Sequence, residues 1–139
     1  RGDVRRRLGD ALDAAAGVAR EPGEHNPKPF RAELLIAVVA SPKDHPQVPE
    51  WEQHATAAGA AHLLELALWQ AGWGVMWRTG LLANSAPVRA VHRLTEREHL
   101  MGWLYVGSIA ESYRRRMLES NRPPLDPHQF LGRMPDVSG

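Results

Sequence analysis

The feature that most constrains the fold is a long segment, residues 50–72, that is rich in alanine and leucine. Both residue types are strong helix formers, and Pro49 lies just ahead of the segment. From Ala55 onward, its clearly polar members are Thr56, His62, Glu65 and Gln70. A helix this apolar around most of its circumference must be buried on several sides. One small sheet cannot cover it completely, so the spare apolar face predicts a partner subunit, and hence a homodimer.

Length and composition describe one ordinary domain. A chain of 139 residues with 43% hydrophobic and 24% charged residues is typical of globular proteins. With 17 basic and 16 acidic residues the net charge is +1, which gives no electrostatic argument for binding nucleic acid or an anionic membrane. The polar residues of the long helix also argue against a membrane span.

Two further features concern the cellular compartment. The chain has no cysteine, which excludes disulfides, zinc–thiolate sites and iron–sulfur clusters and fits a reducing cytoplasm. The basic residues 1–7 are not followed by an apolar stretch, so they do not resemble a secretion signal. We therefore expect a cytoplasmic protein.

The remaining elements are read from periodicity and from glycine and proline. We expect helices at 3–18 and 88–94, the latter opened by Pro87. We expect strands at 33–40, 73–78 and 99–107, and a left-handed turn at Gly72 that ends the long helix. We assign residues 1–110 to the core. Residues 111–139 form a tail with a short basic helix at 113–118 and an extended proline-rich end, packed on the core or on a partner subunit.

Sequence motifs for nucleotide or metal binding give little support to those functions. The stretch Gly72-Trp73-Gly74 lacks the third glycine of a dinucleotide fingerprint and leads from a helix into a strand, the reverse of the required order. No Walker-type loop or nucleophile elbow occurs. His54 and His62 are two helical turns apart, too far for shared ligation, so no metal site is predicted.

Four stretches in order carry a resemblance to a known family. They are Pro29-Phe30-Arg31-Ala32, Val48-Pro49-Glu50-Trp51-Glu52-Gln53, Gly72-Trp73-Gly74-Val75-Met76-Trp77-Arg78-Thr79-Gly80 and Gly102-Trp103-Leu104-Tyr105-Val106-Gly107. Together they resemble the nitroreductase family, and most closely its small YdjA-like subgroup. The resemblance runs from about the first helix to Gly107. It implies an α+β fold with a central, mainly antiparallel sheet flanked by helices, and with the long helix buried at a dimer interface.

The resemblance also implies a function and a site. Members of the family are FMN-dependent oxidoreductases that pass hydride from NAD(P)H, through the flavin, to a nitroaromatic, quinone-like or other small acceptor. The segment matching Trp77, Arg78 and Thr79 lines the FMN site. The nicotinamide cofactor is assigned to the end of the long helix, at the positions matching Ala67, Leu68, Trp69, Gln70, Ala71 and Gly72. No catalytic acid–base residue is expected, because the flavin itself supplies the redox chemistry.

Two alternatives stay open at this point. Trp77 and Arg78 can instead be a core side chain and the partner of a surface acid, since buried aromatic residues usually serve packing. The family's N-terminal segment carries an arginine-rich clamp for the FMN phosphate, and this sequence begins after it, so the sequence is expected to lack an upstream part. A truncated or degenerate relative would keep the dimer and bind a ligand or partner without turnover.

Overall fold

Strand β3 (His99–Gly107) is the central strand of a three-stranded antiparallel sheet in the computed structural model, which describes residues 2–119 and 123–133. Strand β1 (Leu34–Ala40) lies on one side of it and β2 (Gly74–Arg78) on the other. The continuous run of apolar residues along β3 explains its place, because a strand covered on both faces needs apolar side chains on both. The predicted antiparallel sheet and its three strands are confirmed.

The pairing of β3 with β1 contains one irregularity. Val38 lies opposite Gly102 and Val39 lies opposite Leu100, so Met101 is an extra residue in β3, as in a β-bulge. Gly102 has φ +119°, and a Cβ atom there would overlap the carbonyl oxygen of Arg78 at the end of β2. A glycine is therefore required for the close approach of β3 to that end.

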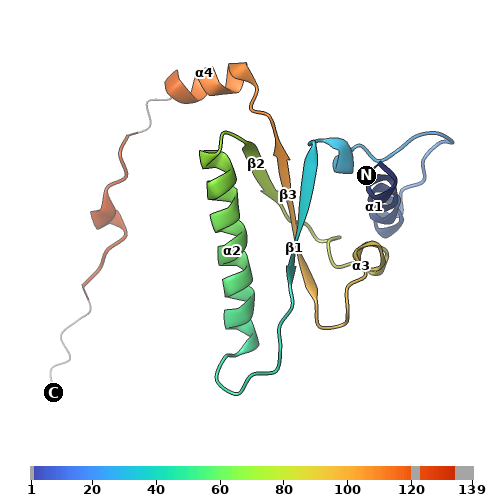
Figure 1. Cartoon of the computed structure of the whole chain (residues 1–139), viewed down its shortest axis with the longest axis horizontal. Coiled ribbons are helices and arrows are strands. Elements are labelled where there is room, and N and C mark those ends of the chain that lie inside the picture. The colour runs from blue at the N-terminus through green and yellow to red at the C-terminus, as the bar shows by residue number, and fades with distance from the viewer. Residues whose placement is uncertain (1, 120–122, 134–139) are drawn as a thin grey trace. The chain divides into compact units, whose positions relative to one another are not determined.

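Helices cover both faces of the sheet. Helix α2 (Glu50–Gln70) lies on one side, and α1 (Gly2–Ala16) and α3 (Ala86–His92) lie on the other (Figure 1). The core on the α1–α3 side consists of buried apolar side chains from both helices, from the turn before α3 and from β3. They are Leu8, Ala11, Leu12, Ala83, Val88, Leu100 and Trp103. The predictions of α1, α2 and α3 are confirmed within two residues at each end.

Helix α2 is covered on one face only within a single chain. Ala61 is its only fully buried residue, and the helix packs against β1 and β2 through the half-buried residues around it. The predicted burial of α2 on several sides is therefore not achieved inside one chain. The dimer interface that would supply the remaining burial stays a prediction.

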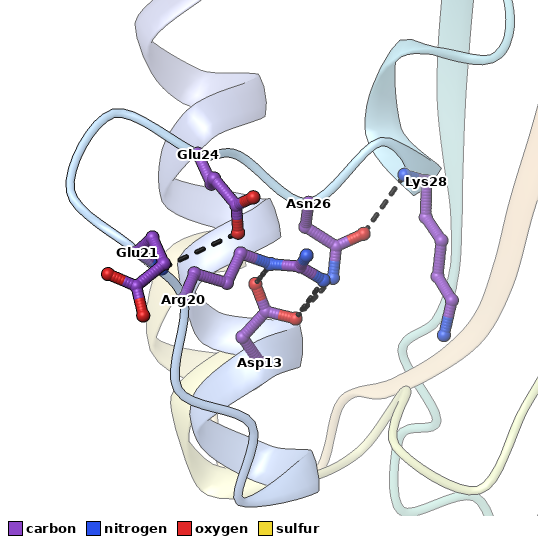
Figure 2. Close-up of polar contacts among 6 residues, drawn as sticks. All are labelled: Asp13, Arg20, Glu21, Glu24, Asn26 and Lys28. Atoms are coloured by element: carbon purple, nitrogen blue, oxygen red, sulfur yellow. Dashed lines mark hydrogen bonds and ion pairs between the residues drawn. The ribbon is translucent and has the colours of Figure 1, made fainter.

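A polar network closes the loop between α1 and β1 (Figure 2). The buried Asp13 carboxylate accepts hydrogen bonds from the Arg20 guanidinium and, at 2.7 Å, from Nδ2 of Asn26. The side-chain oxygen of Asn26 in turn accepts from the backbone N–H of Lys28 at 2.9 Å, in the short 3-10 helix η1 (Lys28–Phe30). These bonds satisfy buried polar atoms and fix the path by which the chain enters β1.

The three arginines near the start of α1 differ in exposure. Arg6 and Arg7 are exposed, but Arg5 is half-buried. The Arg5 guanidinium donates to the backbone carbonyls of Ala32, at 2.8 Å, and Glu33. Arg5 therefore ties α1 to the entry of β1.

The chain divides into two compact units, Arg1–Ile109 and Ala110–Gly139. The second contains α4 (Glu111–Glu119) and the short 3-10 helix η2 (Pro127–Gln129), and its residues 123–133 are exposed. The predicted basic helix is confirmed. Apart from η2, residues 123–133 have no regular structure, and the packing of the tail on the core or on a partner subunit stays a prediction. The parts of that prediction at 120–122 and 134–139 lie outside the described residues. Within the described ranges, no helix is long and apolar enough to cross a membrane.

Candidate cofactor site

The end of β2 carries the three residues expected to line the flavin site. Trp77 and Arg78 are successive strand residues, so their side chains point to opposite faces of the sheet. The half-buried Trp77 donates its indole N–H to the carbonyl oxygen of Met101 at 3.1 Å. Arg78 and Thr79 are exposed. The indole therefore supports the strand end from one face, while the donors of Arg78 are directed to the other.

The open surface beside Arg78 is partly aromatic. The Arg78 guanidinium carbon lies 5.7 Å from the centre of the Tyr105 ring, within the range of a cation–π contact. Burial raises the pKa of the Tyr105 hydroxyl, and the positive charge of Arg78 opposes that change. Met76, opposite Tyr105 in the sheet, is 53% exposed. Apolar area and fixed donors thus occur together here, as a binding surface for a flat polar ligand requires.

The end of α2 carries the residues expected near the nicotinamide. Gly72 has φ +90°, which confirms the predicted left-handed turn. The N–H of Gly72 donates to the Trp69 carbonyl at 2.9 Å, and the N–H of Trp73 donates to the Leu68 carbonyl at 3.0 Å. These two bonds form a Schellman motif that ends the helix sharply and turns the chain into β2. Leu68 is half-buried, whereas Ala67, Trp69, Gln70, Ala71 and Gly72 are exposed.

The two sets of predicted site residues do not meet within one chain. The helix end directly precedes the first residue of β2, and Trp77 to Thr79 lie at its other end. A groove of about 1020 Å³ runs beside β1 and includes Leu68 and Trp73, but none of Trp77, Arg78 or Thr79. A single composite site would therefore need both ends of β2 to face a ligand shared with a second subunit.

The outward face of α2 is mainly apolar, with Glu52, His62 and Gln70 as exposed polar residues on it. Its exposed large apolar side chains are Trp51, Leu63, Leu64, Leu66 and Trp69, which are 68%, 67%, 40%, 50% and 40% exposed. Ala55, Gly59 and Ala60 on the same exposed face are small. Small residues between large apolar ones allow another helix to approach closely. This face has the composition of the centre of an interface rather than of a wetted surface.

Comparison with known proteins decides the family. The sequence profile of the nitroreductase family matches residues 4–108, which is more than half of the chain. The chain belongs to the nitroreductase family. Two curated relatives, each called "Putative NAD(P)H nitroreductase YdjA", come from Escherichia coli strain K12 and Escherichia coli O157:H7. Each is 39% identical over 80 residues, which is 58% of this chain and 44% of the relative.

One solved structure shows the fold of this nitroreductase-family chain. A nitroreductase-like family protein from Bacillus cereus matches with a TM-score of 0.66 and 16% identity, over 94% of this chain and 67% of that one. The FMN- and NADPH-dependent nitroreductase NfnB from sphigopyxis sp. strain HMH matches with a TM-score of 0.49 and 21% identity, over 96% and 60% of the two chains. The matched stretch spans less than half the length of the curated relatives.

A polar cluster at the other end of α2 was missed by the sequence reasoning. Glu50 and His54 in the first turns of the helix lie beside His99, the first residue of β3. The sequence pairing considered was His54 with His62, two turns along. The four-residue spacing of Glu50 and His54 indicates that these two side chains are neighbours on a helix. The position of His99 beside them depends on the register of β3 in the sheet, which cannot be read from the spacing of residues in the sequence.

Proposed function

We propose that the chain belongs to an FMN-dependent oxidoreductase that accepts hydride from NADH or NADPH. The electrons would pass to a nitroaromatic, quinone-like or other small acceptor in the second half-reaction. The observation that carries the proposal is the family match over residues 4–108. The name of the curated relatives, which refers to NAD(P)H and to nitro compounds, supports the choice of donor and acceptor.

The residues at the end of β2 fit a planar ring that carries hydrogen-bond acceptors. When bound, the flavin supplies the hydride and electron chemistry, and the protein has to hold and orient the ring. The exposed Arg78 offers a fork of N–H donors, and Thr79 beside it offers a hydroxyl. Trp77 acts from the opposite face, through its hydrogen bond to the Met101 carbonyl, by fixing the backbone from which these donors project. No catalytic acid or base is needed among them.

The end of α2 fits the approach of a nicotinamide. Leu68 and Trp69 present apolar surface, and Gln70 presents an amide that can both donate and accept. The turn at Gly72 leaves open space, because no atom lies within 4 Å of where its Cβ would be. We propose that Ala67 to Gly72 form one wall of the path by which NAD(P)H reaches the flavin.

The working form is proposed to be a homodimer through the outward face of α2. Its exposed apolar side chains make a stable monomer in water unfavourable, since a contiguous apolar patch of this kind usually marks an interface. A two-fold contact would also bring the start of β2 in one subunit and the end of β2 in the other subunit toward the same ligand. The flavin would then lie between subunits, which accounts for the incomplete site in a single chain.

The decisive experiment uses the purified chain incubated with excess FMN and then desalted. The proposal requires a yellow protein with close to one FMN per chain that bleaches under anaerobic conditions when NADH or NADPH is added. Reoxidation by a nitroaromatic or a quinone completes the turnover. A colourless protein that remains dimeric would favour the alternative, a degenerate relative that keeps the fold without redox activity.

A further inference from the structure

The cluster of Glu50, His54 and His99 has the composition of a metal site. The side-chain atoms able to act as ligands all lie within 4.8 Å of one another. Nε2 of His54 lies 3.3 Å from Oε1 of Glu50. The rings of His54 and His99 have their centres 5.1 Å apart and meet edge to face at 61°. Two imidazoles and one carboxylate therefore converge on a single point.

The backbone places these three side chains firmly. Glu50 and His54 are four residues apart in α2 and so lie on the same side of the helix. His99 pairs with Ala40, at the end of β1 from which the chain leaves toward α2. The connecting loop is held by the side chain of Gln53, which accepts from the N–H of Lys43 at 2.8 Å and donates to its carbonyl oxygen at 2.9 Å. The helix start and the sheet are thus tied together around the cluster.

The ligand chemistry selects the ion. Imidazole suits zinc and its transition-metal neighbours, whereas magnesium and calcium prefer oxygen ligands alone. Zinc binds histidine nitrogen and carboxylate oxygen at about 2.0–2.2 Å, so two of its ligands lie no more than about 4.4 Å apart. The 3.3 Å between His54 and Glu50 lies inside this limit, and all three ligand atoms lie within 4.8 Å of one another. Rotation of Glu50, whose side chain is 67% exposed, can adjust the position of its carboxylate at the ion.

We propose that Glu50, His54 and His99 bind one zinc-class divalent cation, with water completing the coordination shell. A cavity of about 420 Å³ adjoins the cluster and includes both Glu50 and His99 in its lining, which leaves room for that water. The same lining contains Arg97, paired with Asp44 at 2.7 Å. The Arg97 guanidinium lies near Glu50, and its positive charge repels a cation bound there. The affinity of this site for zinc is therefore lower than that of closed structural zinc sites. The site is independent of the flavin.

The test is a titration of tag-free, full-length chain with Zn²⁺ against a chromophoric chelator. The expected result is one Zn²⁺ per chain in the parent protein and an affinity at least about tenfold lower in His54→Ala and in His99→Ala. Glu50→Gln keeps the shape of the side chain, removes its charge and is expected to weaken binding as well. Circular dichroism of each variant shows whether it remains folded.

A matched control comes from the same helix. Nδ1 of His62 lies 3.4 Å from Glu65, so this pair is also a histidine beside a carboxylate, but it belongs to no cluster of three ligands among the described residues. His62→Ala should therefore leave zinc affinity unchanged. Equal losses in His62→Ala and His54→Ala, or no binding by the parent, would overturn the proposal.

A second measurement does not depend on the variants. Paramagnetic Co²⁺ should broaden the ring resonances of His54 and His99 in the parent protein first, and those of the other histidines only at higher concentration. Uniform broadening of all seven histidines would mean weak surface binding and would contradict a defined site.

Discussion

The indole N–H of Trp103 donates a hydrogen bond to Nε2 of His92 at 3.1 Å, and the two rings are 5.8 Å apart and tilted by 43°. Trp103 is only 6% exposed and lies in the middle of β3, while His92 is the last residue of α3. The bond therefore joins the end of a short helix to the centre of the sheet. It also fixes His92 as an acceptor, which requires the neutral imidazole at Nε2.

Replacing His92 with phenylalanine should destabilise the protein by about 1–3 kcal/mol. The ring volume is largely kept, but the buried indole N–H of Trp103 loses its acceptor, and an unsatisfied buried donor costs this much. Urea unfolding measured at neutral pH gives the difference directly. His25→Phe, at an exposed position of the loop between α1 and β1, is the control and should change stability by less than about 0.5 kcal/mol.

The same contact predicts a pH dependence. Burial lowers the pKa of His92, so the unfolded chain binds a proton at a higher pH than the folded one. The stability from neutral His92 is therefore fully present above its ordinary pKa of about 6.5 and is lost as the pH falls toward the lower folded value. His92→Phe should remove this component of the stability profile between neutral and mildly acidic pH. An identical slope in parent and variant would contradict the assignment.

Asp13→Ala should cost about 2 kcal/mol of stability. The substitution leaves the buried Asn26 amide without its acceptor and releases Arg20, so the loop from α1 to β1 loses its anchor. Asp10→Ala, one turn earlier and exposed, is the matched control and should be nearly neutral. Thermal unfolding of both variants tests the difference.

Asp13 also gives an acid-side signature. Its hydrogen bond from Arg20 lowers the pKa of the carboxyl, so its contribution is complete above the ordinary value of an aspartate and is lost as the pH falls through the lower folded pKa. The parent should therefore lose more stability than Asp13→Ala on acidification below about pH 4. Parallel curves would show that the network contributes little.

Gly102→Ala should destabilise the sheet by about 3 kcal/mol and loosen the end of β2. A Cβ atom at position 102 overlaps the Arg78 carbonyl and lies 3.1 Å from Cα of Thr79, and the positive φ adds strain. Gly107→Ala in the same strand is the control, because its Cβ would lie 4.0 Å from the nearest atom and its φ is ordinary. Chemical denaturation of both variants measures the loss of stability, and their FMN binding reports on the end of β2. Equal results for Gly102→Ala and Gly107→Ala would contradict this role of Gly102.

Local patterns predicted the elements well. The limits of β3, residues 99–107, match the structure because its apolar residues are continuous and glycine ends it. Gly72 was correctly placed in a left-handed turn, since a long alanine-rich helix needs such a residue to stop. These features depend on neighbours within a few positions, which a sequence displays directly.

Relations across the fold were harder to predict. His99 joins Glu50 and His54 only because β3 pairs with the end of β1, and no local spacing encodes that register. The Arg5 bonds to the β1 entry span more than 25 positions and were missed for the same reason. The burial of α2 depends on a second subunit, so it stays a prediction.

Leu63→Glu should convert the proposed dimer to a monomer. The side chain is 67% exposed on the outward face of α2, so a carboxylate there disturbs little inside one chain but would be buried without a partner in the interface. Sedimentation equilibrium measures the change in mass. Arg6→Gln, on the exposed side of α1, lowers the net charge by the same single unit and should leave the mass unchanged. A monomeric parent would refute the interface.

Arg78→Ala should weaken FMN binding about tenfold, which corresponds to about 1.4 kcal/mol. The guanidinium is exposed at the end of β2 and contacts the Tyr105 ring at 5.7 Å, so its removal takes charge and donors from the proposed ring site without opening the core. Fluorescence titration with FMN measures the dissociation constant. Arg6→Ala removes the same side chain from a surface position of α1 and is expected to bind FMN like the parent. Equal affinities in Arg78→Ala and the parent would place the flavin away from this strand end, and the family's cofactor would then have to be sought along the groove beside β1.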